Sequence, residues 1–191
     1  MSLSTRVTML FTLLTSLAVA VLAWVSLPAT PTRLATDGGG WTPHESGPVG
    51  PADRALLTML RQDLLWRIPV SQQAGQLARR PAVRAVATTV AADLTELSDR
   101  VRAVAVQLAV QLPSQPTGQQ QAWSSQLSST SGGRYDQALL AKLRAGCGQL
   151  TPLIAEARAQ TRNELVRALA DQAAALVDRH TKDLTDLINK P

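Results

Sequence analysis

The feature that most constrains this chain is a run of apolar residues spaced three and four apart between residues 81 and 112. That spacing places successive side chains on a single face of an α-helix. At 1.5 Å per residue the helix is about 48 Å long, and other long helices bury such a face best. The apolar positions are Val83, Val86, Val90, Leu94, Leu97, Val101, Val104 and Leu108. The stretch therefore predicts one helix of a bundle.

Three further stretches repeat the pattern, at about 51–79, 134–160 and 161–189. Hydrophobic residues make up 45% of the chain but aromatic residues only 3%, so Ala, Leu and Val must build the core. That composition suits close-packed helices better than sheets. The expected inward positions are Leu57, Leu60, Leu64, Ile68, Leu139, Leu143, Cys147, Leu150, Ile154, Leu165, Leu169, Ala173, Leu176, His180, Leu184 and Leu187. Together the four helices predict an all-α four-helix bundle over 51–191.

Local signals refine the helix boundaries. Pro51 suits a first helical position, and Thr161-Arg-Asn-Glu164 matches a capping box that would open the last helix. Thr117-Gly-Gln-Gln120 has the same form and predicts a short helix over 118–128, within the connection 113–132. Pro69 and Pro152 fall inside predicted helices and are expected to kink them.

The N-terminus carries an export signal. Residues 1–6 are short and basic, and residues 7–27 are apolar and free of charge, which predicts a signal peptide or signal anchor over 1–29. Cleavage and retention as a membrane anchor both remain open. Residues 30–50 are rich in Pro, Gly and Thr and predict a disordered linker. The bundle is therefore expected to work outside the cytoplasm, secreted or anchored to the cell membrane.

Cys147 and His180 are the candidate chemical residues, and both lie on predicted core stripes. A lone cysteine excludes an internal disulfide, and a buried cysteine usually acts as a small hydrophobe. Gly146 and Gly148 flank it, which suggests close helix approach or space once filled by something larger. The chain contains no Glu-x-x-His, so a ferritin-type di-metal centre cannot be assembled. We therefore assign no catalytic, cofactor-binding or metal-binding residue and expect no enzymatic activity.

Partners are less constrained by the sequence. Arg79, Arg80 and Arg84 cluster at the turn between the first two long helices and suggest contact with a membrane or an anionic cell-envelope surface, against the alternative of a solvated turn. The scarcity of aromatic residues argues against base stacking on nucleic acid. No motif identifies a small-molecule substrate.

Over residues 52–189 the chain resembles a bacterial family of exported ferritin-like proteins of unknown function, often labelled outer-membrane proteins. The resemblance rests on Arg80-Pro81-Ala82-Val83-Arg84-Ala85-Val86-Ala87, on Ser131-Gly-Gly-Arg-Tyr-Asp-Gln-Ala-Leu-Leu140 and on the helix end Leu108–Pro113. It implies a ferritin-like bundle.

The departures from that family concern its polar positions. Where the family has two Asp-His pairs, this chain has Asp93-Leu94 and Gly146-Cys147. Where the first long helix of the family usually has Glu, this chain has Arg67 and Pro69. Only His180 corresponds to a retained histidine. If the family pocket binds metal, the resemblance implies that this member has lost it, because Arg67 would repel a cation.

The positions of three candidate residues along their helices favour one order and direction of the helices in the bundle. Asp93, Cys147 and His180 reach a similar level if the second and third long helices run parallel, which requires 113–132 to cross the bundle.

The leading hypothesis is an exported, non-catalytic bundle that binds or scaffolds at the cell envelope. The alternatives are a degenerate metal- or redox-responsive protein using His180, Cys147 and Asp93, and a module that binds anionic surfaces.

Overall fold

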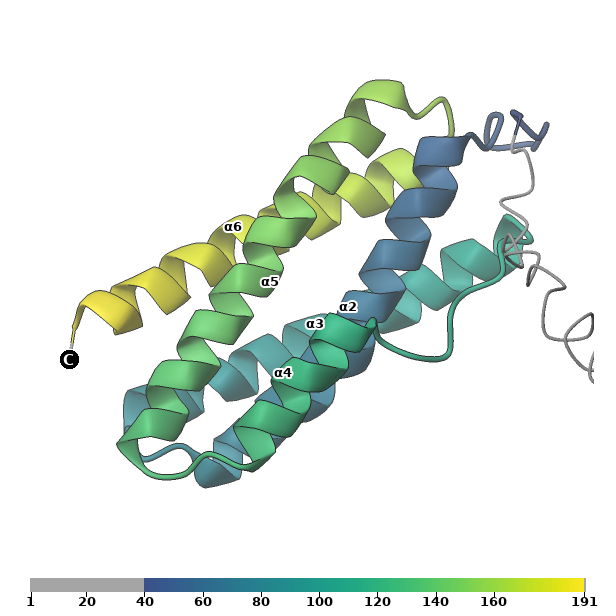
Figure 1. Ribbon diagram of the computed structural model, residues 1–191. Coiled ribbons are helices and arrows are strands. Elements are labelled where there is room, and N and C mark those ends of the chain that lie inside the picture. The colour runs from purple at the N-terminus through teal and green to yellow at the C-terminus, as the bar shows by residue number, and fades with distance from the viewer. Residues whose placement is uncertain (1–39, 191) are drawn as a thin grey trace, which may run out of the picture. The chain divides into compact units, whose positions relative to one another are not determined.

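The computed structural model describes residues 40–190, which form a bundle of helices (Figure 1). The helices are α2 (Pro51–Leu77), α3 (Pro81–Gln107), α4 (Gly118–Ser128), α5 (Gly133–Gln160) and α6 (Glu164–Asn189). Within 40–190 no strand occurs, and the only β-type pairing is an isolated bridge between Thr42 and Val49. The predicted all-helical class is confirmed.

Hydrogen bonds at one end of the bundle define how the long helices run. The backbone N–H groups of Arg79 and Arg80 donate to Asp136 near the start of α5, and Arg80 also donates to the carbonyl of Leu187 near the end of α6. Consecutive helices α2/α3 and α5/α6 therefore form two antiparallel pairs, while α3 and α5 run in the same direction. This is the crossover arrangement that residue heights favoured.

The connection that crosses the bundle contains the short helix α4 between two non-helical segments. Thr117 and Gln120 form the predicted capping box, and α4 lies against α2 and α5 (Figure 1). Trp123 of α4 packs edge-on against Trp66 of α2, with ring centroids 5.3 Å apart, and Leu127 is buried. The predicted helix over 118–128 is confirmed, and it covers part of the bundle flank.

The core follows the predicted stripes, except that Ile68 of α2, Val86 of α3, and Leu165 and Leu187 of α6 are only partly buried. Leu57, Leu60 and Leu64 are fully buried, but Ile68 is only partly buried, and Trp66 and Arg67 fill the interior instead. The helix remains continuous through Pro69, as does α5 through Pro152.

Two predicted boundaries are corrected. The second long helix ends at Gln107 rather than near 112, because Ala109 adopts a left-handed backbone (φ 53°) and Val110 N–H donates to the carbonyl of Ala105. This is a Schellman-type ending, here built without glycine.

The predicted capping box at Thr161 is also wrong. Asn163 is the N-cap of α6, and its side chain accepts from the N–H groups of Leu165 and Val166.

The described part of the predicted linker, residues 40–50, packs against the bundle. Thr42 and Val49 exchange backbone hydrogen bonds, Val49 is buried, and the Asn163 side chain donates to the carbonyl of Gly47. His44 Nε2 lies 3.0 Å from the carbonyl oxygen of Gln107. The folded unit therefore starts earlier than the linker prediction allowed. The predicted leader over 1–29 and the rest of the linker lie outside the described residues, and none of the described helices is long and apolar enough to cross a bilayer.

Candidate functional site

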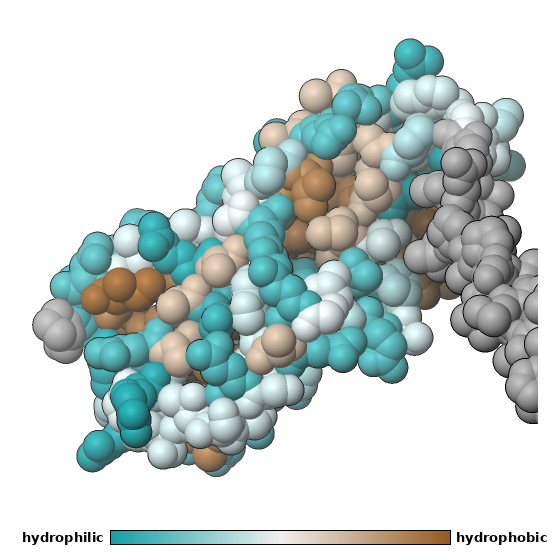
Figure 2. Space-filling model, viewed as in Figure 1, coloured by the Kyte–Doolittle hydropathy of each residue, from teal (hydrophilic) through white to brown (hydrophobic). Residues whose placement is uncertain are grey.

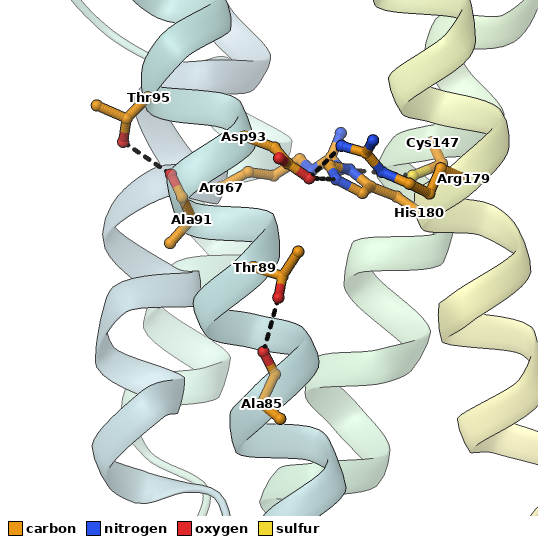
Figure 3. A network of polar contacts seen from close by, with 9 residues as sticks. All are labelled: Arg67, Ala85, Thr89, Ala91, Asp93, Thr95, Cys147, Arg179 and His180. Carbon is orange, nitrogen blue, oxygen red and sulfur yellow. Dashed lines mark hydrogen bonds and ion pairs between the residues drawn. The ribbon is translucent and has the colours of Figure 1, made fainter.

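The most unusual group in the interior is the guanidinium of Arg67 on α2, which is fully buried (Figure 3). Arg67 Nη1 donates to Asp63 Oδ2 at 2.8 Å, one helical turn earlier. Burial lowers the pKa of Arg67, but the Asp63 carboxylate and the Cys147 sulfur outweigh burial and raise it. The bundle therefore holds a permanent positive charge at its centre, which only close acceptors can make tolerable.

Asp63 is the counter-ion of that charge. Its Oδ2 accepts from Arg67, and its Oδ1 accepts from the indole N–H of Trp66 at 3.2 Å, so both oxygens are satisfied. Burial raises the pKa of the Asp63 carboxyl, while the guanidinium and the indole N–H oppose that rise. Breaking this pair from either side would leave an unpaired charged group in a dry interior.

The second terminal nitrogen of Arg67 connects α2 to two other helices. Nη2 donates to Cys147 Sγ of α5 at 3.4 Å and to His180 Nδ1 of α6 at 3.5 Å (Figure 3). Because a guanidinium can only donate, His180 Nδ1 must be the unprotonated nitrogen. The remaining Nε of Arg67 has no hydrogen-bond partner within 40–190.

His180 links this interior to the surface through Asp93 of α3. Its Nε2–H donates to Asp93 Oδ2 at 2.9 Å, and Arg179 donates to the same oxygen at 2.6 Å (Figure 3). Burial lowers the pKa of His180, although the bond to Asp93 opposes it. Burial alone would raise the pKa of Asp93, but the hydrogen bonds from His180 and Arg179 outweigh it and lower that pKa. The histidine is therefore neutral and the carboxylate ionised at neutral pH. We call the connected set Asp63, Trp66, Arg67, Asp93, Cys147, Arg179 and His180 the polar layer.

The two glycines beside Cys147 have different surroundings. A Cβ on Gly146 would lie 3.0 Å from Trp66 Cζ2 and 3.3 Å from both Arg67 Cδ and Asp63 Oδ1, whereas a Cβ on Gly148 would meet nothing within 4 Å. Gly146 is therefore required for the close approach of α5 to α2. The suggestion of close approach is confirmed at Gly146 and wrong at Gly148, which faces open space.

The sequence-predicted residues Cys147, His180, Asp93 and Arg67 all join this one layer. Sequence reasoning missed three members of the layer: Asp63, which is the counter-ion of Arg67, and the hydrogen-bond donors Trp66 and Arg179. The missed signal was the spacing of four between Asp63 and Arg67 on a stripe that otherwise faces inward, since such a pair shares one face of a helix.

The arginine cluster lies elsewhere, at the α2–α3 turn. Arg84 donates to the carbonyls of Ala78 and Arg79, and Arg80 donates to those of Leu187 and Lys190. Two of the three predicted anion-binding side chains thus cap helix ends. The N–H groups of Arg79 and Arg80 are occupied by Asp136. A solvated, self-capped turn describes this cluster better than an open anion site.

The polar layer does not suit a metal ion. Among residues 40–190, no group of three or more His, Cys, Asp and Glu side chains has ligand geometry. The physical reason lies in the donor set: the Arg67 guanidinium already occupies Asp63, Cys147 and His180, and its charge would repel a second cation. The metal pocket that the family resemblance raised therefore does not fit these residues.

Comparisons with known proteins find the same fold in a solved structure and a matching family, but they assign no activity to this chain. No curated protein matches the sequence significantly. The chain is similar to a solved structure described as the crystal structure of a DUF305 fragment from Deinococcus radiodurans, with a TM-score of 0.65 and 11% identity over 74% of this chain and 97% of that one. At that identity the likeness shows the fold alone. The model of a family described as a domain of unknown function, DUF4142, matches residues 42–187, which contain the packed N-terminal turn and nearly all of the bundle. The chain therefore belongs to the DUF4142 family.

Proposed function

We propose that this protein is an exported, non-catalytic, ferritin-like bundle that acts at the cell envelope by binding or scaffolding. The basic and apolar N-terminal segment supports export. The parallel α3 and α5 and the crossing connection support the ferritin-like assignment, because ferritin-like folds use one long crossover.

A single observation carries the non-catalytic part of this proposal: Arg67 is fully buried and donates to Asp63, Cys147 and His180. In a ferritin-like bundle the centre is where side chains from facing helices hold metal. Here a guanidinium takes the carboxylate, sulfur and imidazole that would otherwise be ligands. The protein supplies its own internal cation and needs no other.

Metal analysis of the purified protein tests this. We expect no stoichiometric Mn, Fe or Zn after incubation with each metal and desalting. The Arg67→Ala variant is the matched control, because it removes the repelling charge and keeps Asp63, Cys147 and His180. Metal uptake by this variant and not by the unmodified protein would show that the guanidinium excludes a cation. A stoichiometric transition metal in the unmodified protein would overturn the proposal.

Location is tested separately. Mass spectrometry of the natural protein, together with cell fractionation, should find it outside the cytoplasm with either a cleaved or an intact leader. A cytoplasmic protein that keeps residues 1–29 would contradict the export part and leave the account of the polar layer unaffected.

One alternative keeps specific support. Cys147, His180 and Asp93 belong to one connected network, as a metal- or redox-responsive protein would need. On that hypothesis Cys147→Ala and His180→Ala would abolish a measurable response to metal or oxidant. On our proposal they change stability and nothing else.

A further inference from the structure

We infer that the groove between α5 and the C-terminal turns of α6 binds a single-chain anionic amphiphile, of the fatty-carboxylate class. This deepens the proposed envelope role by naming a ligand class, although the groove and its test do not depend on the polar layer. The groove has a volume of about 680 Å³, within the range of small-ligand sites.

The floor of the groove is apolar. Leu140, Ala141 and Ala145 of α5 face Leu187 and Ile188 of α6 across it, and Ile188 is 41% exposed. Figure 2 shows a hydrophobic patch near the C-terminal end of α6. Gly148 opens the floor further, since no atom lies within 4 Å of where its side chain would begin. Small side chains along α5 thus leave a channel that an acyl chain can occupy.

The charged side chains that line the groove are all positive. Arg80 and Arg144 line it, and no carboxylate is among its lining residues. Arg80 is held in place by its bonds to the carbonyls of Leu187 and Lys190, whereas the guanidinium of Arg144 donates no hydrogen bond within residues 40–190. An apolar floor with the free guanidinium of Arg144, and with the positive charge of Arg80 beside it, complements an apolar chain that ends in a carboxylate.

A second groove between the same helices shows that this charge is unusual. Near the other end of the bundle, Arg158 and Arg167 line a groove that also contains Asp171. There Arg158 Nε pairs with Asp171 at 2.8 Å, so the groove is partly neutralised by the protein itself. Of these two grooves, the one at Arg144 leaves a guanidinium available to a ligand.

Titration calorimetry with laurate below its micelle concentration tests the inference. We expect saturable one-to-one binding, and weakening by about tenfold or more in Arg144→Gln, which removes a charge-assisted hydrogen bond. Gly148→Leu should abolish binding by filling the floor. Ala92→Leu is the matched control, since it adds the same side chain to an exposed position of α3 outside the groove, and it should bind laurate normally.

Further probes separate this ligand from related ones. Dodecanol should bind more weakly than laurate, because it has the apolar chain but no carboxylate. Inorganic phosphate should not bind, because it has the negative charge but no apolar chain. Absence of laurate binding would overturn the inference, as would binding that Gly148→Leu and Arg144→Gln leave unchanged. Binding only to phosphatidylglycerol vesicles, insensitive to Gly148→Leu, would also overturn it in favour of a surface contact. None of these outcomes bears on whether the protein is exported.

Discussion

Arginine has different roles at the centre and at the end of this bundle. At the centre, the Arg67 guanidinium is fully buried and bonded to a carboxylate, a thiol and an imidazole. At the end, Arg80 and Arg84 keep part of their surface in water and bond to backbone carbonyls of helix ends. The same side chain thus serves as an internal counter-ion in one place and as a cap in the other.

This difference indicates that burial determines how much a charged side chain contributes to the free energy of unfolding. Removing Arg67 leaves Asp63 ionised or forces it to take up a proton, without water to solvate it. Removing Arg84 leaves the backbone carbonyls of Ala78 and Arg79 without this donor but leaves no charged group unpaired. The variants below test that contrast, beginning with the largest expected effect.

Arg67→Met should lower the free energy of unfolding by about 3–5 kcal/mol, because it breaks a buried ion pair from one side. Urea denaturation followed by circular dichroism measures the loss. Arg61→Met is the control on the same helix. Arg61 reaches only Ser98 at 3.5 Å, so its loss should be within about 0.5 kcal/mol. Equal losses in the two variants would contradict a special role for the buried arginine.

The glycines beside Cys147 provide a matched pair. Gly146→Ala and Gly148→Ala gain the same helix propensity, but only the first forces a methyl group against Trp66 and Arg67. The Gly146 variant should therefore be less stable than the Gly148 variant by about 1–3 kcal/mol. Gly148→Ala should be more stable than the unmodified protein by up to about 1 kcal/mol. If both alanines stabilise equally, α5 does not approach α2 closely.

Acid should weaken the bundle through His180. Because its pKa is lowered in the folded state, the unfolded chain binds more protons below the ordinary value of 6.5. Stability should then fall as pH decreases below 6.5, by at most about 1.4 kcal/mol per pH unit. Denaturation between pH 7 and 5 measures the slope.

His180→Gln should flatten that slope, whereas His44→Gln, which changes the other histidine, should keep it. The two carboxyl groups of the layer act in opposite directions in acid, because the pKa of Asp63 is raised and that of Asp93 is lowered from the ordinary value of 3.8. A slope that survives in His180→Gln would show that another group causes it.

At the basic end the expected effects are smallest. Arg84→Gln should cost about 0.5–1.5 kcal/mol, since Arg84 bonds the carbonyls of Ala78 and Arg79. Arg79→Gln should cost almost nothing, because the bond from Arg79 to Asp136 uses its backbone N–H and not its guanidinium. Melting temperatures of the two variants test this, and a larger loss in Arg79→Gln would contradict the capping assignment.

Much of the fold could be predicted because helix periodicity is a local property. The stripes on α3, α5 and α6 named most of the core, and Thr117 to Gln120 marked the short helix. The end of α3 was missed because an alanine, not a glycine, adopts the left-handed conformation at Ala109. The packed turn at 42–49 was missed because its composition resembles a linker while its partner, Asn163, is distant in sequence.

The candidate site was only half predictable. Cys147 and His180 could be placed inside the bundle from their stripes, and at one level with Asp93 from their heights along the helices, but the hydrogen bonds that join them could not be predicted. Their common partner, Arg67, is a residue type that is almost never buried unless it is paired. The pairing depends on the approach of α5 to α2 at Gly146, which is a tertiary property that no local pattern encodes.

A double-mutant cycle on Asp63 and Arg67 tests the central claim most directly. Asp63→Leu, Arg67→Met and the combined variant are compared with the unmodified protein by urea denaturation. If the guanidinium is the internal cation of this bundle, the double variant should lose at least about 2 kcal/mol less than the sum of the single losses. Single losses that add to within about 0.5 kcal/mol would mean that the two charges do not depend on each other, and the account of the polar layer would be wrong.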